Sequence, residues 1–313
     1  MDNFIDLTTI EDIRALAQAG IDLKQNADPS AATIGLNKIL TCLYLNPSLR
    51  TKLSTEIAAK QLGMHCINLA ADSAWTLETR AGAIMNEGAA EHIKEQAMVL
   101  SEYSDIIAIR AFPKLKDAKE DYQNDFISKF AKYSKKPIVN LESGSLHPLQ
   151  GLADLMTIME TINKPNPKIV LSWAPHPRQL PQSVANSFSD TIQKAGYDLT
   201  ICCPEGMELS DQYAHHAKVS HDQMEAFEDA DIIYVKNWSS YHSYGATYED
   251  ANWMITGDKM AKTNNANFMH CLPVRRNVVV ADEVIDSPNS IIDRQVSNRV
   301  HAAKIVLHSI LNR

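Results

Sequence analysis

Residues 45–56 carry side chains whose types and spacing could bind an anion. Pro47 lacks an N–H for a strand ladder and disfavours helical geometry in the residue before it, so the chain must turn there. Ser48 is a suitable N-cap, and the backbone N–H groups after an N-cap have no partner within the helix. Arg50 can hold a phosphate through two parallel N–H groups, and Thr51 adds a hydroxyl. The segment therefore predicts a phosphate site at a helix start, with an ordinary capped helix carrying one surface Arg as the alternative.

Three further clusters of polar residues follow predicted strands. Arg110 comes directly after an apolar run, residues 147–150 read His-Pro-Leu-Gln, and residues 270–273 read His-Cys-Leu-Pro. Taken singly, each has an ordinary interpretation: Arg110 as a solvated charge, His147 as a core or capping histidine, and Cys271 as an inert buried thiol. Because all of them follow a strand, as the first segment does, their coincidence indicates one shared site.

Short β-rich runs alternate with helical segments along the chain. This alternation predicts an α/β protein with two doubly wound parallel-sheet domains, whose ligands bind at the carboxyl ends of the strands. A proline-rich break at residues 163–167 sets the predicted boundary, giving domains 1–162 and 163–313, and the last helix is expected to pack back on the first domain. Gly20 is expected to end the first helix. Strands are expected at residues 39–45, 65–69, 106–109, 138–140, 168–173, 198–202, 232–235 and 267–270, and helices at residues 8–19, 48–62, 91–103, 125–132, 148–161, 181–195, 223–227, 258–262 and 290–311.

Composition limits the partners and the location. The chain has 313 residues and a net charge of −8, so nucleic-acid binding, which needs a basic face, is not expected. No apolar run approaches the ~20 residues that span a bilayer, so no membrane partner is expected. The start of the chain lacks the basic and apolar regions of a signal peptide. The five cysteines include no Cys-x-x-Cys pair, which argues against a zinc site and predicts a cytoplasmic location.

Together the four clusters resemble the aspartate/ornithine transcarbamoylase superfamily, whose carbamoyl-phosphate signature is Ser-x-Arg-Thr followed by His-Pro-x-Gln, with His-Cys-Leu-Pro added in ornithine-type members. The order and spacing hold across nearly the whole chain. The resemblance implies a carbamoyl-phosphate domain followed by an amino-acid domain, in an enzyme that needs no cofactor, metal or covalent intermediate. It also implies a homotrimer in which a neighbour's loop completes each site, and residues 70–88, with Trp75, match that loop.

The resemblance also assigns roles on the carbamoyl-phosphate side. The carbonyl oxygen would be polarised by Arg110, His147 and Thr51. The carbamoyl nitrogen would be fixed by Gln150 and the backbone carbonyl of Leu272. The residues implied in catalysis are Arg50, Thr51, Arg110, His147, Gln150 and Cys271. Those implied in binding carbamoyl phosphate are Ser48, Leu49, Arg50, Thr51, Trp75, Arg110, His147, Pro148, Leu149, Gln150, Cys271, Leu272 and Arg299.

The acceptor amine is a narrower question. The Asp-containing segment and the Ser-Met-Gly loop that bind free ornithine in ornithine enzymes are missing, as are the aspartate branch's own motifs, and the chain resembles the N-acylornithine transcarbamylases instead. Acylation removes the positive charge of the α-amine, so an acidic residue is no longer needed to bind it. The carboxylates of the substrate remain, and Lys236 and Arg275 would bind them. The matching positions for the acylornithine are Glu142, His176, Lys236, Arg275 and, near the acyl group, Ala90.

Position 90 bears on whether the acyl group is acetyl or succinyl. It tends to be Glu in acetyl-specific members of this branch and Pro in succinyl-specific ones, and this chain has Ala90. A Glu would repel a succinyl carboxylate, so Ala90 favours N-succinyl-L-ornithine as the acceptor, with N-succinyl-L-citrulline as a product in arginine biosynthesis. N-acetyl-L-ornithine is the alternative, followed by ornithine or putrescine, and a non-catalytic anion-binding paralogue is more remote. A dehydrogenase-like nucleotide-binding protein is a different class, but no Gly-x-Gly-x-x-Gly follows a predicted strand.

Overall fold

A computed structural model gives the fold and describes residues 1–26, 29–70 and 77–312. The first half of the chain builds a four-stranded parallel sheet in the order β2-β1-β5-β6. Its three strands other than β2 are almost wholly buried, as parallel strands with both faces covered are. The strands are β1 (Ile39–Tyr44), β2 (His65–Ala70), β5 (Ile106–Arg110) and β6 (Ile138–Glu142).

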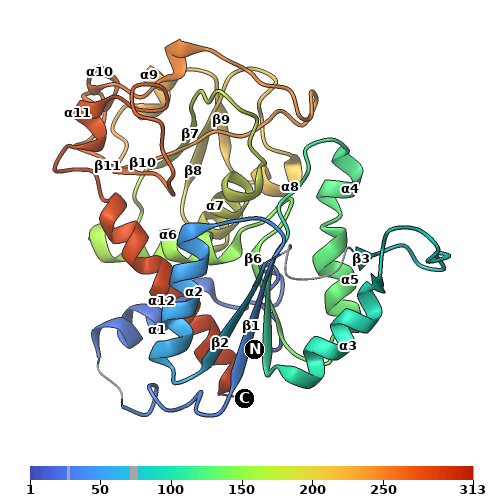
Figure 1. The fold of residues 1–313 in the computed structure, drawn as a ribbon. Helices are drawn as coiled ribbons and strands as arrows, with labels where there is room; N and C mark the ends of the chain where they lie inside the picture. Colours follow the sequence, from blue (N-terminus) through green and yellow to red (C-terminus); the bar gives the residue numbers. More distant parts are fainter. Residues whose placement is uncertain (27–28, 71–76, 313) are drawn as a thin grey trace.

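Helices cover both faces of this sheet (Figure 1). One face is covered by α1 (Ile13–Gln25), α2 (Leu49–Gln61), α6 (Pro148–Thr161) and α12 (Ile292–Leu311), and the other by α3 (Ile93–Tyr103) and α5 (Asp125–Tyr133). Successive side chains of a strand point to opposite faces. Leu40 and Cys42 of β1 therefore join the core under the first group, whereas Leu43 joins the core under the second.

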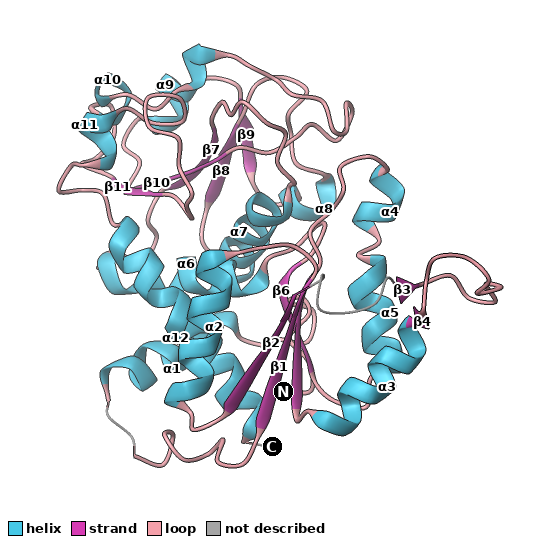
Figure 2. Ribbon diagram, viewed as in Figure 1, coloured by secondary structure: helices cyan, strands magenta, loops and turns pink. Residues whose placement is uncertain are grey.

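The second half builds a five-stranded parallel sheet in the order β11-β10-β7-β8-β9 (Figure 2). Its strands are β7 (Ile169–Trp173), β8 (Leu199–Cys202), β9 (Lys218–Ser220), β10 (Ile232–Lys236) and β11 (Asn267–Met269). The helices and short turns around it are α7 (Ser183–Lys194), α8 (Asp211–Ala214), α9 (Gln223–Phe227), η2 (Ala251–Trp253), α10 (Gly257–Met260) and α11 (Asp282–Ile285). The predicted α/β architecture with two parallel sheets is thus confirmed.

Helix α12 returns the chain from the second half to the first. It packs against α2, α6 and α1, so the expectation that the last helix packs back is confirmed. The two termini consequently lie close together (Figure 1), and the amino group of Met1 is 3.4 Å from the backbone oxygen of Ser309. The predicted boundary between residues 162 and 163 falls between α6 and β7, and it stays a proposal.

The first helix differs from its prediction. It begins after Asp12, whose carboxylate accepts a hydrogen bond from the Ala15 N–H at 2.9 Å, and it continues through Gly20 to Gln25. Gly20 lies within the helix, where its lack of a side chain allows close packing. An added Cβ there would lie 2.9 Å from Cε of Met156 in α6. The residue allows α1 to approach α6 closely, a use of glycine that the local sequence does not distinguish from a helix stop.

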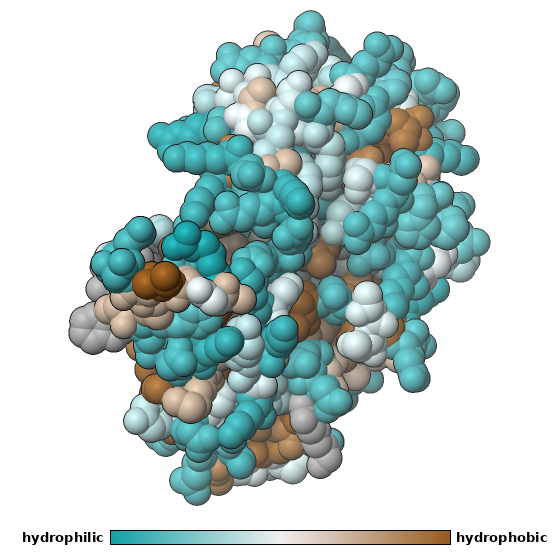
Figure 3. Space-filling view, turned by 90° about the vertical axis from the view of Figure 1, so that its right-hand side faces the viewer, coloured by the Kyte–Doolittle hydropathy of each residue, from teal (hydrophilic) through white to brown (hydrophobic). Residues whose placement is uncertain are grey.

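A loop projects from the first half beside α3 (Figures 1 and 2). It joins the short strands β3 (Leu77–Glu78) and β4 (Glu91–His92), and Ile84 at its tip is 82% exposed. The face on that side is mainly hydrophilic, with small separate hydrophobic patches (Figure 3). The predicted loop residue Trp75 lies outside the described residues. Among the helices described, none is long and apolar enough to cross a membrane.

Candidate active site

One cavity of about 410 Å³ opens at the carboxyl ends of the strands. It is lined by residues that end or follow β1, β5 and β6 of the first sheet and β7, β10 and β11 of the second. In parallel sheets these ends are where ligands bind. The predicted residues that line it are Ser48, Leu49, Arg50, Thr51, Arg110, Glu142, His147, Gln150, His176, Lys236, Cys271, Leu272, Arg275 and Arg299.

A few predicted residues do not line this cavity. Pro148 is the first residue of α6, and Leu149 is buried in the core, so both are close to the cavity only through the start of the helix. Ala90 is exposed, directly before β4, and does not line the cavity of its own chain.

The start of α2 provides unused donors at the cavity. Ser48 is the N-cap, with φ −154° and ψ 115°, but its hydroxyl makes no capping hydrogen bond. The guanidinium of Arg50 is half-buried and, within the described part of the chain, has neither an ion pair nor a hydrogen bond. A helix start, with its free N–H groups and positive dipole end, beside an unpaired Arg is suited to bind an anion.

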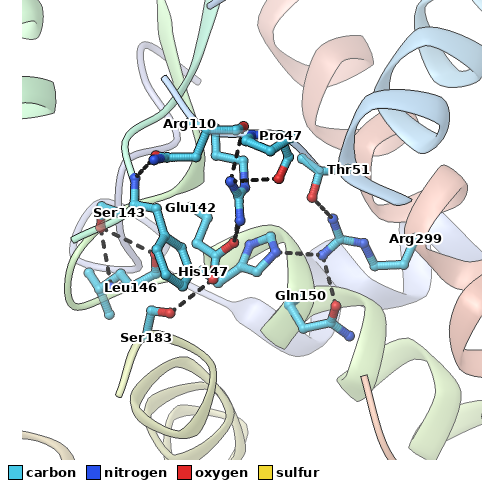
Figure 4. A network of polar contacts seen from close by, with 12 residues as sticks. Pro47, Thr51, Arg110, Glu142, Ser143, Leu146, His147, Gln150, Ser183 and Arg299 are labelled. Carbon is cyan, nitrogen blue, oxygen red and sulfur yellow. Dashed lines mark hydrogen bonds and ion pairs between the residues drawn. The ribbon is translucent and has the colours of Figure 1, made fainter. Parts of the chain in front are cut away.

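Arg110 holds the turn before α2 against the first sheet (Figure 4). Its Nη1 donates to the backbone oxygens of Asn46 at 3.1 Å and Pro47 at 3.2 Å. Its Nε and Nη2 donate to Oε2 of Glu142 at 3.2 and 2.9 Å, and Ser183 donates to the other carboxylate oxygen at 3.1 Å. A guanidinium has five N–H donors, and most of those of Arg110 are used in hydrogen bonds to other protein groups of the site. Its main structural effect is to fix the turn before α2.

Arg299 connects α12 with α2 and with the start of α6 (Figure 4). Its Nη1 donates to Nε2 of His147 at 3.0 Å and to Oε1 of Gln150 at 2.9 Å, and its Nη2 donates to the Thr51 hydroxyl at 3.2 Å. Because Arg can only donate, each of these three groups must accept. The Thr51 hydroxyl proton is therefore left to point elsewhere, as a donor.

His147 is neutral and its tautomer is determined by Arg299. Burial, followed by the charges of Arg299 and Arg110, lowers the pKa of His147 well below its ordinary value. Since Nε2 accepts from Arg299, the ring proton is on Nδ1, which is buried and has no hydrogen-bond partner among the described residues. The imidazole thus keeps one unpaired N–H donor. It cannot serve as a cationic group at neutral pH.

The second sheet contributes cations without carboxylate partners. Lys236 ends β10 and is only 9% exposed, yet no described acidic residue pairs with it. His176 lies 2.8 Å from the Arg178 backbone oxygen through Nδ1, and its Nε2 is 3.2 Å from Nε of Arg275. Burial lowers the pKa of His176, which favours the neutral ring that accepts from Arg275. A nearly buried, unpaired ammonium beside Arg275 is suited to bind a carboxylate.

Cys271 is buried beside these groups. Burial raises the pKa of its thiol, although the charge of Lys236 opposes the shift. The thiol is therefore protonated at neutral pH, and the arrangement provides no thiolate nucleophile.

Several other residues at the cavity were not predicted as site residues, and three of them are charged, polar or aromatic. Arg178 lies at the exposed rim, the ring of Phe112 is 5.0 Å from the Arg110 guanidinium, and Ser183 holds the carboxylate of Glu142. Phe112 and Arg178 each follow a predicted site residue by two positions, so the strand-end rule could have found them. Ser183 opens α7 and reaches Glu142 only through the tertiary fold.

The sequence is similar to those of known carbamoyltransferases. Residues 3–160 match the carbamoyl-P binding domain of aspartate/ornithine carbamoyltransferase, and residues 180–310 match the Asp/Orn binding domain. The N-succinylornithine carbamoyltransferases of Bacteroides thetaiotaomicron and Bacteroides fragilis are 46% and 42% identical, over 89% and 99% of each chain. The N-acetylornithine carbamoyltransferase of Xanthomonas campestris is 36% identical over 88% of each chain.

A solved structure gives the same result. A variant of N-acetyl-L-ornithine transcarbamylase complexed with carbamyl phosphate and N-succinyl-L-norvaline matches with a TM-score of 0.93 at 33% identity, over 99% of this chain and 100% of that one. Two family domains, relatives well above 30% identity and a shared fold all indicate the same assignment. The chain therefore belongs to the aspartate/ornithine carbamoyltransferase family and is a carbamoyltransferase of its N-acylornithine branch.

Proposed function

We propose that this enzyme transfers the carbamoyl group of carbamoyl phosphate to the side-chain amine of N-succinyl-L-ornithine, giving N-succinyl-L-citrulline and phosphate in cytoplasmic arginine biosynthesis. The observation that carries the proposal is the charge of the cavity. Its lining includes six basic side chains and one acidic one, and the acidic Glu142 is already paired with Arg110. Both substrates are anionic, so a surplus of positive charge is what the reaction needs.

Carbamoyl phosphate fits the half of the cavity formed by α2 and α6. Its phosphate, with about two negative charges, would accept from the free N–H groups at the start of α2 and from Arg50. The carbonyl oxygen would accept from Thr51 and from the unpaired N–H of His147, with Arg110 alongside. The carbamoyl nitrogen would donate to the second lone pair of the Gln150 oxygen and to the Leu272 carbonyl. Each of these roles agrees with the hydrogen-bond capacity left over in the site.

The chemistry is the attack of a neutral primary amine on the carbonyl carbon. As the new C–N bond forms, negative charge builds on the carbonyl oxygen in the tetrahedral transition state. The C–O bond to phosphate then breaks, and the phosphate leaves with the bonding electron pair and takes up the proton that the amine loses. Fixed donors at the carbonyl oxygen are expected to contribute most, about 3–4 kcal/mol for a well-placed one. Because Arg299 already orients Thr51 and His147, these donors need no reorganisation when the reaction occurs. Holding amine and carbonyl in contact contributes much of the remainder.

Three observations support succinyl as the acyl group. The N-succinylornithine relatives are 46% and 42% identical, against 36% for the N-acetylornithine relative. A succinyl group adds a carboxylate, and the cavity has an exposed cation, Arg178, at its rim beside Lys236 and Arg275. Position 90 is Ala, which places no negative charge near that carboxylate. N-Acetyl-L-ornithine is the second candidate, because a transcarbamylase for it shares the fold with a TM-score of 0.91.

Acceptor preference is the direct test. Phosphate release from carbamoyl phosphate should be fastest by kcat/KM with succinylornithine, slower with acetylornithine and negligible with ornithine. Replacing Ala90 with Glu should shift the succinyl-to-acetyl ratio of kcat/KM toward acetylornithine by about tenfold or more, because like charges at close range cost more than about 1 kcal/mol.

The neutral variant Ala90→Gln is the matched control. It adds nearly the same volume without the charge, so it should change the ratio by much less than Ala90→Glu does. An unchanged ratio in the Glu variant would contradict the assignment of succinylornithine through this position.

We also propose that the enzyme is a homotrimer. Leu49, Leu53 and Ile57 form an exposed apolar stripe on α2, with exposures of 71, 49 and 42%, and Leu49 also lines the cavity. The projecting loop lies at the right-hand edge of the molecule, away from α2 (Figure 1). If the loop of one copy packs on the stripe of the next, the contact is head-to-tail, and such contacts form a ring when the rotation between copies closes. Such contacts would bring the loop region of one copy, including Ala90, to the cavity of the next.

Leu53→Asp is expected to dissociate the trimer and reduce activity, because it places a charge in the apolar stripe. Light scattering should report one chain mass for the variant and three for the natural protein. Val219→Asp is the control, since Val219 is also an exposed apolar residue, at 45%, on β9 far from α2 in the chain. A Leu53→Asp protein that keeps its mass would remove the stripe from the interface.

A further inference from the structure

Asp154 is a buried carboxylate next to the active site that no sequence motif assigned. It lies in α6, four residues after Gln150, and has no exposed surface. Its Oδ1 accepts from the side-chain amides of Gln150 and Gln295, each at 2.7 Å, and no described Lys or Arg forms an ion pair with it. An isolated buried carboxylate is costly, so its place at the back of the site calls for a reason.

The hydrogen bonds give a direction to the amide of Gln150. Since Asp154 accepts at one end, Gln150 must turn its nitrogen toward Asp154 and its oxygen toward Arg299. A Gln150 turned the other way would set two donors against each other, because Arg can only donate. Arg299 in turn donates to His147 and Thr51. Asp154, which can only accept when ionised, therefore sets which group donates and which accepts along the contacts from Gln150 to Arg299, His147 and Thr51.

We propose that Asp154 is a positioning residue for carbamoyl transfer, which orients the Gln150 amide and thereby holds Arg299 where it fixes the donors His147 and Thr51. Asp154 does not line the cavity and acts only through these neighbours. The role rests on the proposed function, because it is the carbonyl oxygen of carbamoyl phosphate that these donors would polarise. It accounts for a carboxylate, rather than an apolar residue, behind Gln150.

The surroundings of Asp154 make the role dependent on pH. Burial raises the pKa of Asp154 to about 7, while hydrogen bonds from Gln295 and Gln150, the nearby Tyr234 hydroxyl and the charge of Arg299 lower it in part. Further titratable groups lie close to this cluster: Cys271 next to Tyr234, and His147 and Glu142 around Arg299. When Asp154 is protonated, its carboxyl gains a donor and becomes a weaker acceptor for Gln150. The alignment should therefore be complete above pH 7 and weaken as the pH falls below it.

The test compares Asp154→Asn with the natural enzyme, using carbamoyl phosphate and the best acceptor. We expect kcat to fall by about 10- to 100-fold, as misplacement of catalytic groups does, with less than a threefold change in KM for carbamoyl phosphate. The ratio of natural to variant kcat should itself fall as the pH is lowered through 7, since the natural enzyme alone loses the carboxylate. Taking the ratio removes the titration of the amine substrate, which both proteins share.

Thr157→Val is the matched control on the same helix. Thr157 is also fully buried, its hydroxyl donates to the Ala153 backbone oxygen and accepts from Asn298, and it makes no contact with the site. It should lose a similar amount of stability and keep kcat within about twofold. If Asp154→Asn does not fold, Tyr234→Phe gives the second test: losing the hydroxyl should move the acidic limb of the kcat profile to higher pH.

The possible results separate the two proposals. A natural enzyme that carbamoylates none of the amines defeats the proposed function. An active natural enzyme whose Asp154→Asn variant keeps kcat within twofold, or whose kcat ratio to the variant does not change with pH, defeats the positioning role alone. An acidic limb that stays in place in Tyr234→Phe also defeats it, because the limb would then belong to another group.

Discussion

Replacing Arg50 with Ala is expected to lower kcat/KM for carbamoyl phosphate by about a thousandfold or more. Arg50 is the cation at the start of α2 that has no partner among the described residues, so the whole of its hydrogen-bonding capacity is left for the ligand. A charge-assisted, bidentate contact to phosphate is among the strongest available, and the phosphate gains charge as it leaves. Losing such a contact in the transition state costs about 3–4 kcal/mol or more. Steady-state kinetics with varied carbamoyl phosphate measure the loss.

The same change should not destabilise the protein, which separates loss of function from loss of fold. The charge of Arg50 lowers the pKa of both His147 and Arg299, so Arg50 repels positive charge in the site. Removing it relieves that repulsion, and the thermal midpoint should stay equal or rise. Arg276→Ala is the control, because Arg276 is an exposed Arg paired with Asp282 and Asp286 and should change activity by less than about twofold. An Arg50→Ala enzyme that keeps its activity would overturn the phosphate assignment.

The sequence predicted the large helices and strands well because each contains a clear apolar run or a regular spacing of apolar residues. The strands of both sheets except β9, the start of α2 and the return of α12 follow from such runs and from capping residues, whereas β9, with three residues, was missed. Helix α1 was placed too early because Gly20 reads locally as a stop, whereas tertiary packing against Met156 decides its role. The short pair β3 and β4 has too few residues for any period to show.

The sequence predicted that the strand ends meet at one site, but it did not predict which side chains there form hydrogen bonds with one another. The rule that parallel strands end at one edge brings Arg50, Arg110 and His147 to one cavity. No rule on spacing indicates that Arg110 donates to Glu142, because the two residues are distant in sequence. The i,i+4 spacing does put Asp154 on the same helix face as Gln150, but it does not show that this face is buried behind the cavity. Arg299 came from the resemblance to a family. Its hydrogen bonds to His147, Gln150 and Thr51 are visible only in the folded chain.

Replacing Arg299 with Lys is expected to lower kcat by about 100- to 1,000-fold, even though the formal charge is kept. The guanidinium reaches Thr51 with one nitrogen and His147 and Gln150 with the other, a fork that a single ammonium cannot reproduce. Thr51 and His147 would then lose the contact that fixes their donor directions, and a misdirected donor at the carbonyl oxygen costs about as much as a missing one. Rapid-quench or steady-state assays at saturating substrates measure kcat directly.

The pH dependence of the Arg299→Lys variant distinguishes geometry from charge. Burial already lowers the pKa of Arg299, and a Lys in the same place loses its proton far more readily, because its ordinary pKa is about 10.4. The deficit of the variant should therefore grow as the pH rises and never vanish at low pH, where the ammonium is charged but still lacks the fork. Arg294→Lys on the same helix, where Arg294 is exposed, should change kcat by less than about twofold at every pH. A variant that regains full activity at low pH would mean that charge alone, without the fork, holds the donors.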